Sequence, residues 1–183
     1  MASAAEREWH MDFEAGLALS PDMAGVPGAT SRIALGHDFK DWLGLDVQLG
    51  WSRFGTLIIN EGGGLATETS SHRIMAAGLV RLSPPPFITS KLAGFIPFFS
   101  TGPAMQINLD SAAALQDRQT GFLGGTRSRR VVAGGTWDLN AGILWRFSGP
   151  LSIGLSGHIG VPLGSSSRWD GGLSAVVAWW WSL

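Results

Sequence analysis

The sequence contains no cysteine, so neither a disulfide framework nor a cysteine-ligated metal site is expected in its 183 residues. Charged residues are also scarce, at 15% of the chain against roughly 25% in an average soluble domain. The 13 basic and 14 acidic side chains nearly cancel, which gives no support to nucleic acid as a partner. A chain with so few charges must expose much of its surface to something other than water.

Long apolar runs are missing as well. The two longest, residues 92–99 and 175–181, are less than half of the ~20 residues that a membrane-spanning helix requires. Hydrophobic residues nevertheless make up 45% of the chain, and a closed β-barrel is the other structure that satisfies every backbone group in a bilayer. The first residues have neither the basic nor the apolar region of a signal peptide, so we expect a mature end whose signal was removed.

Residues 136–163 carry the clearest pattern in the sequence. Large apolar side chains alternate there with small or polar ones, first through 137–147 and again through 151–161, with the turn Ser148-Gly149-Pro150 between them. A period of two predicts a β-hairpin with one apolar face and one small, polar face. Each strand is about as long as a tilted membrane-spanning strand, which needs roughly 9 to 11 residues.

The same alternation predicts an all-β fold, an eight-stranded antiparallel up-and-down transmembrane β-barrel. The expected strands cover about 9–19, 31–38, 43–52, 72–82, 87–99, 136–147, 151–161 and 169–183. Residues 54–71 are expected to form a mobile loop, unless the third strand continues through 57–60. The longest loop is expected at about 100–130, where Asp110 or Ser111 would cap a short helix that ends near Gly121.

Long and short connections alternate in this scheme, as they do between the extracellular and periplasmic sides of outer-membrane barrels. No linker is evident, so residues 1–183 are predicted to form one domain. An even number of strands places both termini on the periplasmic side.

The apolar stripes are predicted to face lipid, because an eight-stranded barrel is only wide enough for side chains to fill and cannot hold the bulky residues of every strand. Tryptophan at the strand ends would form an aromatic girdle. The girdle residues are Trp9, Trp51, Trp137, Trp145, Trp179 and Trp181. The titratable residues predicted to face the lumen are His10, Asp12, Glu14, Arg32, Asp46, Arg73, Arg81, Lys91, Asp138, Arg146, His158 and Asp170. In the fifth strand, Lys91 sets the predicted inward face.

Three stretches resemble a known family: residues 137–161 (WDLNAGILWRFSGPLSIGLSGHIGV), 86–99 (PFITSKLAGFIPFF) and 44–51 (GLDVQLGW). They are similar to the small eight-stranded outer-membrane barrels of the OmpA-like and OmpX-like superfamily, and the resemblance covers nearly the whole chain. It implies a porin-like, monomeric membrane protein of the outer membrane of Gram-negative bacteria. Two features depart from the family: tyrosine is absent, and the chain ends in Leu183 where these proteins commonly end in an aromatic residue.

The lumen residues are expected to form a network of ion pairs that plugs the barrel, because buried charges persist when they are paired. Glu14 with Arg73 or Arg146 is the expected central pair. The protein would then give structural support, or make surface contacts through its extracellular loops. An alternative is a narrow ion or proton path that opens when such a pair exchanges partners.

Two further alternatives come from other classes of protein. Lipid A acyl hydrolases and transferases exist on this architecture; here Ser156 and His158 point the same way, and Asp138 or Asp170 could orient the histidine. Their spacing does not match those enzymes, so no catalytic residue is predicted. A soluble lipocalin-like carrier would place the apolar face inside.

The only basic cluster contains Arg127, Arg129 and Arg130, at the expected extracellular rim. Arginine pairs bidentately with phosphate, so membrane lipid, and lipopolysaccharide in particular, is the expected partner; a solvated loop end is the other interpretation. The histidines are scattered singly, so neither a metal site nor a cofactor is expected.

Overall fold

The computed structural model describes residues 8–20, 27–40, 42–61, 65–83, 94–111, 113–117, 123–127, 129–146 and 149–182, with the backbone alone at 55–61, 65–69, 113–117 and 123–127. The strands are β1 (Glu8–Leu19), β2 (Gly28–Lys40), β3 (Leu43–Glu61), β4 (Leu65–Leu82), β5 (Phe95–Asp110), β6 (Ala113–Asp117), β7 (Leu123–Arg127), β8 (Arg130–Arg146), β9 (Leu151–Pro162) and β10 (Asp170–Ser182). Within these residues, no helix is long and apolar enough to cross a membrane.

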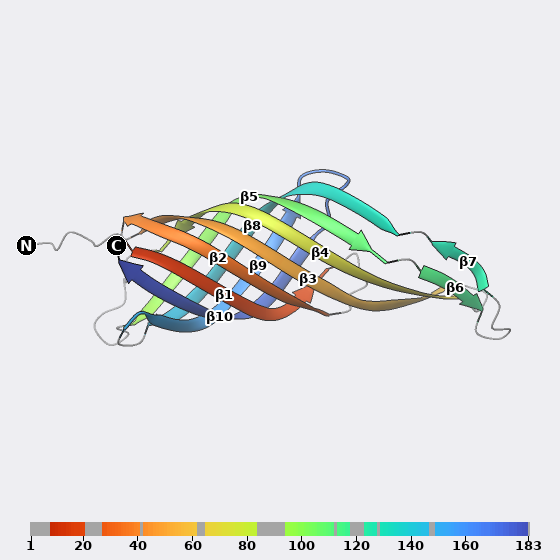
Figure 1. Cartoon of the computed structure of the whole chain (residues 1–183), viewed down its shortest axis with the longest axis horizontal. Coiled ribbons are helices and arrows are strands. Elements are labelled where there is room, and N and C mark those ends of the chain that lie inside the picture. Colours follow the sequence, from red (N-terminus) through yellow and green to blue (C-terminus); the bar gives the residue numbers. More distant parts are fainter. Residues whose placement is uncertain are drawn as a thin grey trace, which may run out of the picture.

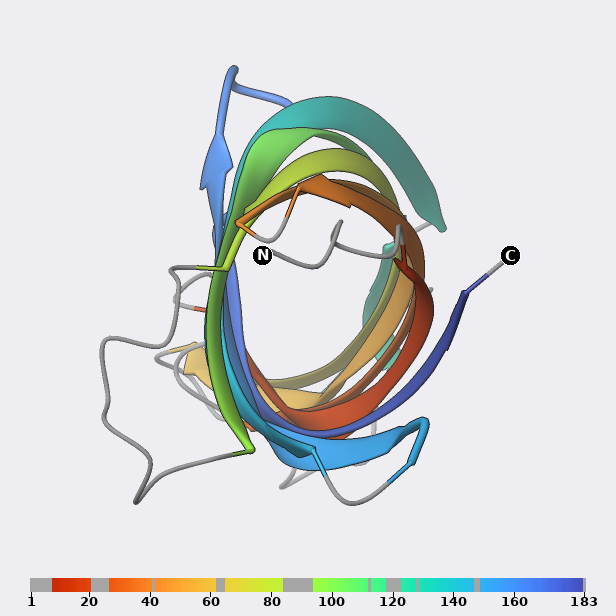
Figure 2. The ribbon, with the colours of Figure 1, turned by 90° about the vertical axis from the view of Figure 1, so that its left-hand side faces the viewer.

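Eight long strands close into an antiparallel barrel. Strand β1 pairs with β2 on one side and with β10 on the other, which joins the first strand to the last. The remaining neighbours follow in the order β2, β3, β4, β5, β8, β9 and β10. Figure 2 shows the closed ring viewed along the barrel. The predicted eight-stranded barrel is confirmed.

The two ends of the barrel differ. Strand β1 begins and β10 ends at one end, which we call the terminal end, and the strand pair β3–β4 extends far beyond the other end, the loop end (Figure 1). The short strands β6 and β7 form a hairpin, and β6 pairs with β4 along this extension.

The expected loop at 54–71 is wrong, and the alternative, a third strand that continues through 57–60, is confirmed, because β3 continues to Glu61 and β4 begins at Leu65. The register of the two strands shifts between Phe54 and Leu57. Such an irregularity adds a residue on one strand and interrupts the alternation. The alternation of inward and outward side chains therefore ends at Phe54, although the pairing of β3 with β4 continues.

The expected loop at 100–130 and its helix are also wrong. Strand β5 pairs with β8 without interruption from Phe95 opposite Trp145 to Asp110 opposite Arg130. The backbone of Ser111 then donates to the carbonyl of Ser70, and residues 113–117 are a strand instead of a helix. Residues 87–93 of the predicted fifth strand lie outside the described part of the chain.

The prediction placed the odd-numbered residues of the fifth strand inside the barrel, and this is wrong. Phe98 is buried in the lumen whereas Phe99 points outward, so the even-numbered residues of β5 face inward. Both faces of 95–99 are apolar, and alternation carries no information in such a segment. Lys91, which set the prediction, lies outside the described residues.

The outer wall is apolar and the interior is largely polar. Exposed leucines, valines and tryptophans cover the wall, with exposed fractions as high as 68% at Val131 and Leu173. The inward-facing apolar residues form two main clusters, one of Phe98, Leu144, Val176, Ala178 and Trp180 and one of Met75, Ala77, Leu79 and Ala104. This orientation is the opposite of that in a lipocalin-like carrier, so that alternative is wrong.

Candidate functional site: the lumen and the outer wall

Arg81 is the centre of the polar network in the terminal half of the lumen. Its Nη1 donates to Oδ2 of Asp12 over 2.8 Å, lies 2.8 Å from Nε2 of His10, and lies 3.9 Å from Oδ2 of Asp46. Asp38 adds a further carboxylate 3.8 Å from His10. One buried guanidinium therefore stabilises carboxylates from several strands.

Two aromatic rings enclose the same guanidinium. The Cζ atom of Arg81 lies 4.6 Å from the ring centre of Phe98 and 5.4 Å from that of Trp180. Trp180 is also close to Arg146, whose Cζ lies 5.3 Å from the indole, and to His10, whose ring centre lies 4.8 Å from that of the indole. The indole N–H donates to Oγ of Ser152 over 3.0 Å. Large apolar groups and cations therefore lie side by side in this half of the lumen.

Arg146 lies at the mouth of the terminal end. Its two terminal nitrogens donate to the two carboxylate oxygens of Glu8, each over 2.9 Å. Both side chains are about 30% exposed, so this pair is in contact with solvent.

Arg32 occupies the middle of the lumen. Its Nη1 donates to Oδ1 of Asn140 over 3.0 Å and to Oε1 of Gln48 over 3.4 Å, and it lies 3.7 Å from Asp138. Asn140 in turn donates to Oγ of Ser100 over 3.4 Å.

Arg73 is the central cation of the polar network near the loop end. It donates to Oδ1 of Asn108 over 2.8 Å and to the carbonyl of Trp169 over 3.1 Å, and its Nη1 lies 3.3 Å from Asp170. Its guanidinium also lies 4.7 Å from the ring of Phe54.

The predicted pairs of Glu14 are not formed. Arg73 contacts Asp170 and Arg146 contacts Glu8, near opposite ends of the barrel. Glu14 lies between them, directly opposite Arg32 in the β1–β2 ladder. The register, which the sequence does not reveal, decides which charges meet.

The predicted lumen residues fall on the inner face wherever the structure describes them, with Arg146 at the mouth. Within these residues, buried carboxylates outnumber buried guanidinium groups by five to three. The five are Asp12, Glu14, Asp46, Asp138 and Asp170, and the three are Arg32, Arg73 and Arg81. Two histidines, His10 and His158, are also buried among these residues.

Ser156 and His158 are both buried, and His158 Nε2 lies 3.8 Å from Asp170. His158 also lines a groove of about 470 Å³ on the outer wall, beside Leu139 and Leu173. Within the described residues, no group of three or more potential ligands is arranged to hold a metal ion.

Sequence reasoning missed Phe98 and Trp180 as lumen residues. The alternation of β10 points Trp180 inward, opposite to Trp179 and Trp181, so its parity alone would have identified it. Gln48 and Asn140 lie on the predicted inward faces of their strands, but the predicted lumen set held only titratable residues. Gln106 and Asn108 were missed because they fall within the expected loop at 100–130.

No family model and no curated protein matches this sequence. Solved structures do match. They include Ail, the attachment invasion locus protein of Yersinia pestis (TM-score 0.54, 9% identity, 96% of this chain and 99% of that one), and a major outer membrane protein from Thermus thermophilus (0.57, 12%, 96% and 99%). Neisserial surface protein A matches with TM-score 0.50 and 16% identity over 94% of this chain and 96% of that one.

This chain has the fold of the small eight-stranded outer-membrane β-barrels. Such barrels have short periplasmic turns and longer extracellular loops. In this chain β1 begins and β10 ends at the terminal end, and β3 and β4 extend beyond the loop end.

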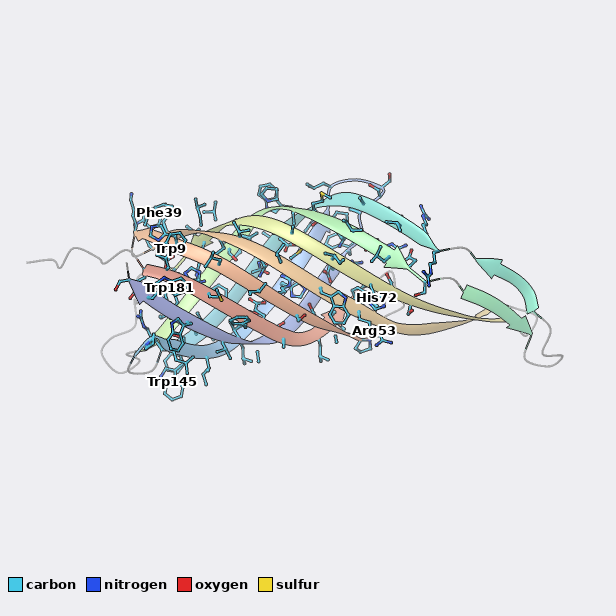
Figure 3. All side chains as sticks on the ribbon, in the orientation of Figure 1. Trp9, Phe39, Arg53, His72, Trp145 and Trp181 are labelled. Carbon is cyan, nitrogen blue, oxygen red and sulfur yellow. The ribbon has the colours of Figure 1, made fainter. Side chains whose placement is uncertain are left out.

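The predicted girdle tryptophans all lie on the outer wall, in two groups. Trp9, Trp145 and Trp181 surround the terminal end together with Phe39 (Figure 3). Trp179, on the same face of β10, belongs to this group. Trp51 and Trp137 lie nearer the loop end, where they pair with residues close to the loop-end limits of β2 and β9.

The basic cluster lies at the loop end, as its place in the sequence requires. Arg129 and Arg130 are exposed there, and the side chain of Arg127 lies outside the described residues. Arg168 belongs to the same end but donates to both carboxylate oxygens of Asp110, over 3.1 and 2.9 Å.

Proposed function

We propose that this protein is a monomeric, integral outer-membrane barrel whose lumen is closed by its own side chains, and that it acts as a structural element or through contacts made at its extracellular end. The fold and the apolar outer wall support the location. The contact role follows from the long β3–β4 extension, which places backbone well beyond the barrel wall (Figure 1).

The observation that carries the closed lumen is the position of Trp180. Its indole lies between Arg81 and Arg146, and Phe98 lies on the other face of Arg81. An ion passing through would have to displace both the rings and the paired charges. Removal of one partner from a buried ion pair costs about 3–5 kcal/mol, so spontaneous opening would be rare.

Burial of Ser156 and His158 supports a non-enzymatic role. Nucleophilic catalysis needs a hydroxyl that a substrate carbonyl can approach, and Ser156 is only 4% exposed.

The exposed Arg129 and Arg130 support lipopolysaccharide as a partner at the extracellular rim. Replacing Arg127, Arg129 and Arg130 with glutamine is expected to weaken lipopolysaccharide binding, and Lys40→Gln at the opposite end is the matched control. Unchanged binding would remove this partner from the proposal.

The closed lumen is tested with the full chain folded in detergent. Heat-modifiable migration on a gel is expected, because a closed barrel resists unfolding by detergent until it is heated. In planar bilayers the same material is expected to give no stepwise conductance. Regular conductance steps from the unmodified chain would replace this proposal with the ion-path alternative.

A further inference from the structure

A groove lies on the outer wall across β10, β1, β2 and β3. Its volume is about 630 Å³, within the range of roughly 300–1,000 Å³ that is typical of ligand sites. Its lining is mostly apolar side chains of the outer wall, and its floor includes Glu14 and Arg32 of the lumen network.

The groove follows from the register of small residues. Ser31, Ala15 and Ala175 lie side by side in one row across β2, β1 and β10. The neighbouring row consists of the large residues Leu49, Ile33, Phe13 and Val177. A row of small side chains beside a row of large ones forms a trough.

One end of the small row is occupied by Trp51, which pairs with Ser31. The ring of His72 lies 5.9 Å from the indole, and His72 lies directly opposite Arg53 in the β3–β4 ladder. Figure 3 shows Arg53 and His72 together on the outer wall toward the loop end. Two side chains that can each carry positive charge therefore lie at the extracellular end of the groove.

This pair has no anionic partner among the side chains that the structure describes. An anion bound here would pair with the guanidinium of Arg53 and accept a hydrogen bond from a ring N–H of His72. Arginine matches the geometry of phosphate with two parallel hydrogen bonds. An anion at this height on a lipid-facing wall would be attached to a hydrocarbon chain, because free ions do not enter the apolar region.

We propose that this groove binds a phosphate-bearing lipid of the outer leaflet, with its phosphate on Arg53 and His72 and one acyl chain over Ser31, Ala15 and Ala175. The inference rests on the proposed outer-membrane location and deepens it. It concerns residues distinct from the rim arginines at 127–130.

The test uses the full chain in detergent micelles, first shown by heat-modifiable migration to be a closed barrel. Native mass spectrometry then follows binding of three probes: lipid A with its phosphates, the same lipid without them, and inorganic phosphate. A one-to-one complex is expected with phosphorylated lipid A alone, because the site needs both the charge and the chain.

Two double variants separate the two halves of the site. Arg53→Gln with His72→Gln is expected to weaken binding by about tenfold through loss of the phosphate contacts. Ala15→Leu with Ala175→Leu keeps the charges but fills the trough, and should weaken binding by about as much. Lys40→Gln and Ala133→Leu, an exposed charge and an exposed alanine away from the groove, are the matched controls and should stay within about twofold of the unmodified chain.

The other possible results of these experiments overturn either the lipid site or the proposed function. A closed barrel that binds no lipid A, binds the phosphate-free lipid or inorganic phosphate equally well, or binds undiminished in either double variant overturns the lipid site and leaves the proposed function standing. A chain that shows no heat-modifiable barrel overturns the proposed function itself.

Discussion

The indole of Trp180 lies 5.4 Å from the guanidinium carbon of Arg81, in the terminal half of the lumen. This contact joins the apolar cluster of that half to its charged network, because Trp180 also packs among Phe98, Leu144 and Val176. Trp180→Ala is expected to open the lumen, and the barrel should then show conductance steps in planar bilayers. Truncation of a buried Trp costs about 3–5 kcal/mol, so the variant should also unfold at lower denaturant concentration.

The control for this prediction is the neighbouring Trp179, which is 52% exposed on the outer wall. Trp179→Ala should leave the lumen closed. Conductance that rises equally in both variants would indicate general loosening of the barrel and would contradict the sealing role of Trp180.

Arg81→Gln is predicted to be among the most destabilising changes in the lumen. It leaves the carboxylates of Asp12 and Asp46 without their buried cation, and breaking a buried pair costs about 3–5 kcal/mol. Unfolding in urea, followed by tryptophan fluorescence, measures the loss. Adding Asp12→Asn should recover part of it, because one unpaired charge is removed.

Arg168→Gln is the matched control for Arg81, since it also breaks an arginine–aspartate pair. Arg168 and Asp110 are 26% and 20% exposed, so this pair should be worth only about 1 kcal/mol. Equal losses at Arg81 and Arg168 would show that burial does not set the strength of these pairs.

Gly36→Ala is predicted to disturb the Arg81 network although Gly36 carries no charge. A Cβ at this position would overlap with Oδ1 of Asp46 and with the ring of His10. Overpacking of this kind costs about 1–3 kcal/mol. Gly78→Ala, where a Cβ would meet nothing within 4 Å, should be neutral or slightly stabilising when measured in the same urea titration. Similar stabilities for the two variants would contradict the close packing at Gly36.

Alternation of side chains predicted the eight-stranded barrel and the inward face of most of its strands. It failed where the pattern itself is interrupted: at the irregularity after Phe54, and at 95–99, where both faces are apolar. The lumen partners could not be predicted because they depend on register and closure. Glu14 faces Arg32, for example, because β1 and β2 pair as they do. The alternation in β10 would have predicted the inward direction of Trp180, but the three consecutive tryptophans obscure that alternation.

The outward orientation of the apolar face gives the last prediction. Leu155 lies in the middle of β9 and is 66% exposed, whereas Leu163 lies just beyond the end of that strand and is 62% exposed. In a soluble protein an arginine at either position would be tolerated equally well. In a bilayer, Leu155→Arg should cost about 2–4 kcal/mol near the midplane and Leu163→Arg about 0–1 kcal/mol at the interface. Reversible folding into lipid vesicles measures the difference. Equal costs at the two positions would contradict the membrane-spanning orientation.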